Sequence, residues 1–94
     1  MSLQIYFTPR SKETFKSTYN FIKNEFGASV AEKFSIKTEK TIKLIADHPL
    51  MFKVSTIATD VRVGLITKQC SVFYRVTDTT IHLLFFWDNR QEPL

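Results

Sequence analysis

Four side chains in the last third of the chain could supply positive charge or move a proton: Arg62, Arg75, His82 and Arg90. General acid–base chemistry needs proton transfer at the reacting atoms, and positive charge stabilises the negative charge that develops there. The three arginines could supply that charge, and only His82 among the four could move a proton near neutral pH. Whether they form one site depends on the elements that carry them.

The N-terminal quarter of the chain predicts a strand followed by a helix. Alternation of apolar and polar residues predicts a strand at 3–7, and the segment 8–11 ends it and caps the next element. A helix at 11–26 is predicted from one apolar stripe, made of Phe15, Tyr19, Ile22 and Phe26. Gly27 then suits a left-handed position at the end of this helix.

A second helix is predicted at 29–47. Ser29 and Glu32 have the spacing of a capping box, and Pro49 stops the helix. Its expected inward residues are Val30, Phe34, Thr38, Thr41, Ile42 and Ile45. Its outer face carries Lys33, Lys37, Lys40 and Lys43, a pattern more typical of a solvated face than of a nucleic-acid site. The short junction at Gly27 predicts an antiparallel helical hairpin.

The C-terminal half predicts a loop and three strands. The loop at 49–60 is apolar enough to pack down, and strands follow at 61–67, 70–77 and 80–87. The predicted fold is therefore a single α+β domain over residues 1–94, with the order β-αα-βββ. A four-stranded, mainly antiparallel sheet carries the helical hairpin on one face.

Two-residue turns at 68–69 and 78–79 predict the pairing of the last three strands. Leu65 then opposes Val72, and Val72 opposes Phe85. The whole set forms an apolar face beneath the helices: Val61, Val63, Leu65, Cys70, Val72, Tyr74, Val76, Ile81, Leu83, Phe85 and Trp87. Cys70 is accordingly expected to be a core residue.

The same register places Arg62, Arg75 and His82 in one row on the opposite face. Adjacent arginines repel, so folding alone does not favour this row. A patch of apolar side chains lies beside the row, with no helix left to cover it: Ile66, Phe73, Leu84 and Phe86. We therefore expect this face, with Arg90 at its end, to bind a partner carrying apolar and acidic groups. The alternative is an exposed sheet face on which the arginines extend into solvent and His82 is structural.

Composition narrows the function classes. The net charge of +4 and a pI near 9.4 fit either an acidic partner or a solvated basic surface. One cysteine and two histidines form neither a disulfide framework nor a zinc site, so no metal or cofactor is expected. No apolar run is long enough to span a membrane and no secretory signal is recognised, which predicts a cytoplasmic protein.

The segment YRVTDTTIHLLFFWDNR, together with the order of elements, resembles the RelE/ParE toxin superfamily of type II toxin–antitoxin (plasmid stabilisation) systems. The resemblance covers essentially the whole chain. It implies a bacterial growth inhibitor neutralised by a cognate antitoxin, as a homodimer or a toxin–antitoxin hetero-oligomer. RelE-like members cut mRNA on the ribosome, whereas ParE-like members poison DNA gyrase.

The match to the ribonuclease members is incomplete. Arg62 matches the first of their basic residues and Arg90 matches their closing arginine. Gly64 and Ser71, however, stand roughly where their other basic residues are expected. No tyrosine or histidine follows Arg90. This favours a ParE-like inhibitor that binds its target without chemistry of its own. The alternatives are a RelE-like, ribosome-dependent mRNA endonuclease with an altered active site that uses Arg62, Arg75, His82 and Arg90, or a degenerate, non-toxic member of the family. RNA cleavage of this kind needs proton transfer at the attacking and leaving oxygens and positive charge beside the phosphate.

Overall fold

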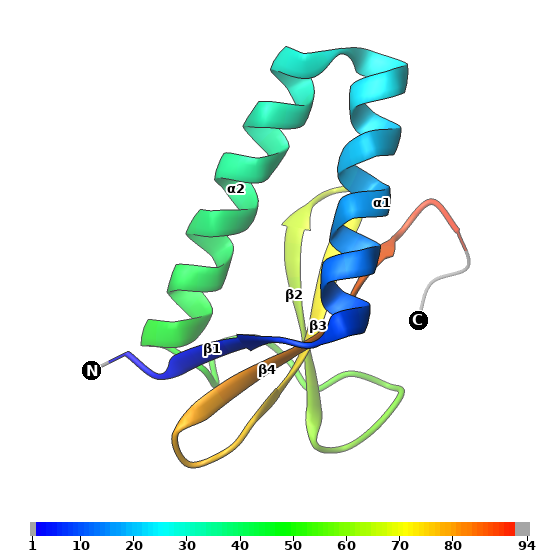
Figure 1. Ribbon diagram of the computed structural model, residues 1–94. Coiled ribbons are helices and arrows are strands. Elements are labelled where there is room, and N and C mark those ends of the chain that lie inside the picture. The colour runs from blue at the N-terminus through cyan, green and yellow to red at the C-terminus, as the bar shows by residue number, and fades with distance from the viewer. Residues whose placement is uncertain (1, 92–94) are drawn as a thin grey trace.

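Two antiparallel helices cover one face of a four-stranded sheet in the computed structural model, which describes residues 2–91 (Figure 1). The elements are β1 (Gln4–Phe7), α1 (Pro9–Phe26), α2 (Ala28–Asp47), β2 (Val61–Thr67), β3 (Cys70–Val76) and β4 (Thr80–Asp88). The predicted order and α+β class are confirmed. No helix among the described residues is long and apolar enough to cross a membrane.

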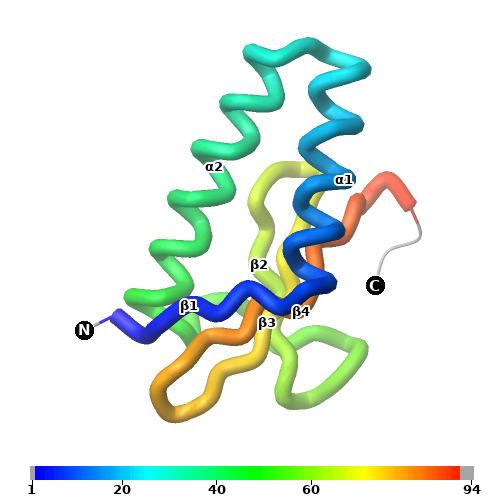
Figure 2. The backbone as a smooth tube through the Cα atoms, in the orientation of Figure 1, coloured from blue at the N-terminus to red at the C-terminus, as the bar shows by residue number. Residues whose placement is uncertain are grey.

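The strands lie in the order β1-β4-β3-β2, so β4 is an interior strand and β2 lies at one edge. β1 runs parallel to β4, while the other two pairs are antiparallel. Where β1 ends, Thr8 donates its N–H to the carbonyl of Leu83 at 3.3 Å, and the chain turns directly into α1. The backbone trace shows β1 lying along β4 before that turn (Figure 2).

The ends of the helices are set by Thr8 and Gly27. Thr8 caps α1 by accepting the N–H of Ser11 at 3.2 Å, and Pro9 occupies the first turn. Gly27 has φ of 97°, as its predicted positive-φ role requires. The predicted capping box of Ser29 is wrong, because α2 already begins at Ala28 with Gly27 as its N-cap and no side-chain cap. One residue between the helices leaves Ser29 inside the first turn.

The main core joins both helices to the sheet through aromatic rings. Phe15 of α1 stacks on Phe34 of α2 at 5.7 Å and meets Phe86 of β4 edge-on at 5.3 Å. The buried members of this core are Phe34, Ile45, Ile66, Cys70, Val72, Tyr74, Ile81, Leu83 and Phe86. Phe26 and Val30 were expected in the apolar stripes, yet both are exposed, because the tip of the helical hairpin extends past the end of the sheet (Figure 1).

Two irregularities change the predicted strand register. Between Leu65 and Thr67 the pairing of β2 with β3 shifts by one residue, so Leu65 opposes Ser71 instead of Val72. Toward the other end of β2, Val61 opposes Arg75 where the prediction had Val76. Because side chains alternate along a strand, this shift moves the side chains of residues 61–66 to the other face, while Thr67 still opposes Cys70 as predicted.

The pairing of β3 with β4 is correct near their turn and wrong beyond it. Tyr74 opposes Leu83 as predicted, as Val76 opposes Ile81. After an irregularity between Phe73 and Tyr74, Val72 opposes Phe86 where Phe85 was predicted, and Cys70 opposes Asp88 where Trp87 was predicted. Leu84 is the extra residue of this bulge, and the insertion is what turns Phe86 toward the helices.

Gly64 supplies a packing reason for the register of β2. A Cβ atom on Gly64 would lie 3.3 Å from the ring of Phe52 and 3.5 Å from the side chain of Ile45. The helix-facing side of β2 thus has little room at this position. Glycine fits there, whereas the predicted register would have placed Val63 and Leu65 beneath the helices.

The loop at 49–60 packs against the sheet, as predicted, although most of the apolar side chains on which the prediction rested are exposed. Tyr74 donates its hydroxyl to the carbonyl of Pro49 at 2.9 Å, and Arg62 donates to the carbonyl of Phe52 at 2.6 Å. Val54 also forms an isolated antiparallel bridge with Arg62. The first half of the loop is therefore fastened to β2 and β3.

Candidate functional site

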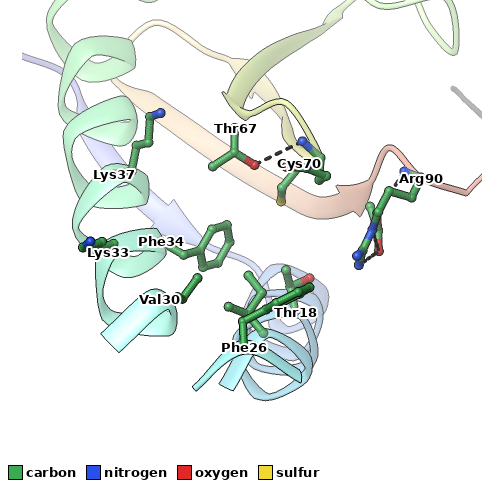
Figure 3. Close-up of a pocket in the computed structure, with 12 residues that line it drawn as sticks. Thr18, Phe26, Val30, Lys33, Phe34, Lys37, Thr67, Cys70 and Arg90 are labelled. Carbon is green, nitrogen blue, oxygen red and sulfur yellow. Dashed lines mark hydrogen bonds and ion pairs between the residues drawn. The ribbon is translucent and has the colours of Figure 1, made fainter. Parts of the chain in front are cut away.

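A cleft of about 350 Å³ lies between the ends of α1 and α2 and the turn that joins β2 to β3 (Figure 3). Its helical walls are mostly apolar, formed by Ile22, Phe26, Val30 and Phe34. Thr67, Gln69 and Cys70 close it on the side of the sheet. The exposure of Phe26 and Val30 at the hairpin tip is what leaves this apolar cleft open to solvent.

The rim of the cleft is basic. Lys33 and Lys37 line it from α2, and Figure 3 shows Lys37 extending toward the side of Thr67 while Lys33 points away. Neither lysine forms an ion pair with any of residues 2–91. The cleft can therefore hold an apolar group whose neighbour carries negative charge.

Arg90 stands at the third side of the cleft and is held by internal contacts. Its guanidinium group pairs with Asp88 at 2.7 Å and lies over the ring of Phe21 at 4.7 Å. Hydrogen bonds from Arg90 lower the pKa of the Asp88 carboxyl, and the same contact raises the pKa of Arg90. Arg90 thereby fastens the C-terminal segment to α1.

A second cavity of about 350 Å³ lies between α1 and the end of β4. It combines aromatic side chains with hydroxyl, carboxylate and amide groups; its lining is Thr14, Ser17, Thr18, Phe21, Phe86, Trp87, Asp88 and Gln91. Thr18 and Asp88 line both this cavity and the cleft. The segment fastened by Arg90 therefore contributes to both cavities.

Cys70 lies at the floor of the cleft and is 2% exposed, which confirms its predicted place in the core. Burial, reinforced by the negative charge of Asp88, raises its pKa to about 12. A nucleophilic cysteine needs an accessible thiolate. Cys70 is therefore suited to packing and not to nucleophilic chemistry.

The sheet face away from the helices carries a second apolar cluster. Phe73 stacks on Phe85 at 4.7 Å, and both rings are buried together with Val61. Ala58 of the loop packs on this cluster, and the guanidinium group of Arg10 lies 4.6 Å from the centre of the Phe85 ring. The patch expected to be bare is thus largely covered by the chain's own loop and by α1.

Two members of the expected patch lie elsewhere. Phe86 and Ile66 belong to the core beneath the helices, because the two bulges turn them to that side. Phe73 remains on the open face but is only 1% exposed. Leu84 packs on the second cluster and is half-buried. A continuous apolar surface made of these four residues therefore does not form.

The predicted row of Arg62, Arg75 and His82 is half correct. Arg75 opposes His82, as expected. Arg62 opposes Tyr74 instead of Arg75, and its guanidinium group donates to the carbonyls of Phe52 and Leu50. The expected repulsion between two neighbouring arginines is therefore wrong, because the bulge in β2 separates them onto different faces.

Tyr6 of β1 takes the place beside His82 and was missed by sequence reasoning. It is paired with His82 in the parallel register, and the two rings meet edge-on at 5.7 Å. Tyr6 is 51% exposed. The alternation of residues 3–7 placed Tyr6 on the side of the strand opposite its apolar residues, which indicated the open face of the sheet. Its contact with His82 could not be predicted, because it depends on the pairing of β1 with the distant strand β4.

The four candidate residues do not form one site. Arg75 forms an ion pair with Asp60 at 2.7 Å near the start of β4, and both side chains are exposed. Arg90 follows the far end of β4, and the six residues from His82 to Asp88 correspond to about 20 Å of strand. Arg62 is held by the loop, through hydrogen bonds to the carbonyls of Leu50 and Phe52. Within residues 2–91 no group of His, Cys, Asp and Glu side chains could hold a metal ion.

Residues 5–93 match the family described as the ParE toxin of type II toxin–antitoxin systems, parDE. The match spans nearly the whole chain. This chain belongs to the ParE toxin family.

Solved structures agree with that membership at the level of fold. The ParE-family chain is similar to a protein in the chromosomal ParDE toxin–antitoxin system of P. aeruginosa, with a TM-score of 0.80 and 16% identity, covering 93% of this chain and 96% of the other. It is also similar to a chain of the RelBE2 toxin–antitoxin complex of Mycobacterium tuberculosis, with a TM-score of 0.66, 13% identity and coverage of 94% and 99%.

A third likeness is to the YoeB dimer of Staphylococcus aureus, with a TM-score of 0.64, 18% identity and coverage of 93% and 97%. No curated protein sequence matches the chain significantly. At these identities the ParE-family chain shares the fold with its structural relatives, and its residue roles must be argued from its own geometry.

Proposed function

We propose that this ParE-family protein inhibits bacterial growth by binding a target such as DNA gyrase, and that a cognate antitoxin neutralises it. The observation that carries the proposal is the separation of Arg62, Arg75, His82 and Arg90. General acid–base catalysis needs the proton-transferring group within hydrogen-bond reach of the reacting oxygen, about 3 Å, with positive charge beside it. His82 has Arg75 beside it, but Arg90 lies at the other end of β4.

The contacts of the arginines support the same proposal. Arg75 pairs with Asp60, Arg90 pairs with Asp88, and Arg62 donates to backbone carbonyls. A nuclease would have to free these guanidinium groups before they could bind a scissile phosphate. A binding inhibitor has no such requirement.

The antitoxin part of the proposal is supported by the family and by the relatives. The family description names a type II toxin–antitoxin system, and the first two structural relatives come from toxin–antitoxin complexes or systems. The basic rim of the cleft and the net charge of +4 fit a partner with acidic groups. As expected for the family, the toxin and antitoxin would then form a hetero-oligomer in the cytoplasm.

The test is induced expression in a bacterial host, with mRNA 5′ ends mapped and plasmid supercoiling measured as growth stops. We expect arrest with intact mRNA and changed supercoiling. His82→Gln should arrest growth as strongly as the natural sequence. Arg75→Ala, which changes the residue opposite His82, is the matched variant and should leave the mRNA equally intact. Co-expression of the neighbouring small reading frame should restore growth.

The opposing outcomes identify the alternatives. New ends inside coding regions that vanish in His82→Gln would establish a ribosome-dependent endonuclease and overturn the proposal. Growth that continues at full rate, with the protein shown to be folded and present, would identify a non-toxic family member.

A further inference from the structure

The cleft between the helices and the β2–β3 turn changes in character with depth. Phe26 and Val30 are 58% and 43% exposed at its mouth, whereas Phe34 and Cys70 are 5% and 2% exposed at its floor. Figure 3 shows Phe34 extending from α2 toward the side of Cys70. Burial raises the pKa of the Cys70 thiol to about 12, so the thiol is uncharged at neutral pH. The floor of the cleft is therefore apolar and suits a hydrocarbon chain.

Two polar groups in the walls of the cleft are already bound within the chain. Thr18 donates its hydroxyl to the carbonyl of Thr14 at 2.9 Å. Asp88 is the one carboxylate among the described residues that line the cleft, and Arg90 donates to it at 2.7, 3.0 and 3.2 Å. A polar group that is already hydrogen-bonded needs no polar atom from a ligand. These walls therefore accept an uncharged aliphatic chain.

Free positive charge lies at one part of the rim. Lys33 and Lys37 lie on adjacent turns of α2, and neither forms an ion pair within residues 2–91. Lys37 extends toward the side of Thr67 (Figure 3). Thr67 accepts the N–H of Gln69 at 3.2 Å, which leaves its hydroxyl hydrogen available to an anion. Lys37 and Thr67 can therefore bind one anionic group at the mouth of the cleft.

We propose that the cleft binds a free aliphatic carboxylate with a single unbranched chain. The carboxylate lies between Lys37 and Thr67, and the chain passes Val30 to contact Phe34 and Cys70. A ligand with one anionic head and an uncharged tail matches a site whose unpaired cations all lie on one side. The cleft of about 350 Å³ is at the small end of ligand sites, which suits a chain of about eight to ten carbons.

This proposal goes beyond the proposed function, since it depends neither on gyrase nor on an antitoxin. It makes chain length and head-group charge separate determinants of affinity. Each methylene group that enters the apolar part of the cleft should strengthen binding about fourfold, until the cleft is full. A cationic head group should weaken binding, because it would lie beside Lys37.

The test measures binding of hexanoate, octanoate and decanoate to the full chain by isothermal titration calorimetry. Affinity should rise at each step of this series. Backbone amide NMR shifts locate the ligand, and we expect them at Val30, Phe34 and Cys70 and not at Ser17 of the second cavity. The decyltrimethylammonium ion has the same alkyl chain as a ten-carbon ligand and the opposite charge. It serves as the control and should bind about tenfold more weakly than decanoate.

Lys37→Glu and Lys40→Glu form a matched pair of charge reversals. Both lysines are exposed on α2, but Lys40 does not line the cleft. Lys37→Glu should weaken decanoate binding about fivefold, and Lys40→Glu should leave it nearly unchanged. Equal losses in the two variants would overturn the proposal, because they would show that the net charge of the protein attracts the anion.

Val30→Trp tests whether the ligand occupies the cleft. The larger side chain at the exposed mouth can fill the cleft without entering the main core, so decanoate should bind more than about tenfold more weakly. The NMR shift at Cys70 should disappear as well. Ile36→Trp is the matched variant, because Ile36 is 47% exposed on the same helix and lies outside the cleft. Circular dichroism checks that both variants remain folded.

Four other results would overturn the proposal. These are absence of saturable decanoate binding, equal affinity for hexanoate and decanoate, undiminished binding to a folded Val30→Trp protein, and shifts confined to the second cavity. Binding to phosphatidylglycerol vesicles without binding of free decanoate would also overturn it and would identify a membrane surface as the ligand. Should Val30→Trp not fold, the two lysine variants decide. None of these measurements bears on toxicity, so failure here is distinguishable from failure of the proposed function.

Discussion

Thr14 of α1 accepts the backbone N–H of Phe86 of β4 at 2.9 Å, across 72 positions of sequence. At Phe86, β4 has no neighbouring strand on this side, because β1 has already ended. The side chain of Thr14 therefore supplies the hydrogen-bond acceptor that a strand would otherwise provide. Thr8 prepares the same arrangement by donating its hydroxyl to the carbonyl of Leu83 at 2.7 Å. The hydroxyls of the N-cap Thr8 and of Thr14 in α1 thus bind backbone groups of β4 beyond the end of β1, and the far end of β4 is left beside the second cavity.

Thr14→Val should destabilise the protein, because it removes the acceptor and leaves the N–H of Phe86 without a partner. The expected loss is about 1–2 kcal/mol in the free energy of unfolding. Thr14→Ser keeps the hydroxyl and should lose much less. Urea denaturation of both variants measures the difference, and an unchanged free energy of unfolding in Thr14→Val would show that the hydrogen bond to Phe86 does not stabilise the protein.

Arg62→Ala should release the loop at 49–54, whereas Arg75→Ala should not. Both changes remove one positive charge, but Arg62 holds the carbonyl of Phe52 at 2.6 Å and Arg75 holds only exposed Asp60. Amide exchange of the loop should accelerate several-fold in the first variant alone. Exposed ion pairs contribute about 0–1 kcal/mol, so Arg75→Ala should scarcely change stability. Similar exchange in both variants would contradict the assigned role of Arg62.

Arg90→Ala should raise the pKa of Asp88 toward its ordinary value of 3.8, since hydrogen bonds from Arg90 are the main cause of its lowering. A lowered folded-state pKa means that the stabilisation by Asp88 is present above its ordinary pKa and is lost as the pH falls through the lower folded value. Carboxyl NMR titration measures the change. Arg75→Ala is the control and should leave the titration of Asp88 unaltered. An unshifted curve in Arg90→Ala would show that the ion pair does not persist in solution.

The thiol of Cys70 should react with a disulfide reagent only when the protein unfolds. Its pKa is raised from 9.0 to about 12 by burial, so the folded state retains the proton that the unfolded state releases above pH 9. Cys70 therefore lowers stability as the pH rises from 9 toward 12. The reaction rate should follow the unfolded fraction across a urea titration. A fast reaction in native conditions would mean that the cleft admits the reagent to the sulfur atom.

The sequence by itself determined the order of elements and most of their boundaries. The apolar stripe of Phe15, Tyr19 and Ile22, the stop at Gly27, and the turns at 68–69 and 78–79 depend on neighbouring residues only. Local periodicity and turn chemistry are sufficient for such features. The pairing of Arg75 with His82 was also predictable, because it lies within a few residues of a tight turn.

Only the tertiary structure decided which side chains face the helices and which lie on the open sheet. The shifts near Ile66 and Leu84 each insert one residue, and each reverses the faces of the strand beyond it. Their causes are distant contacts: the limited space between Gly64, Phe52 and Ile45, and the meeting of Phe86 with Phe15. A two-residue alternation can be read from sequence, but it cannot show where packing interrupts the alternation. For that reason Arg62 lies beneath the loop, Tyr6 stands beside His82, and Leu65 is exposed at the edge of the sheet.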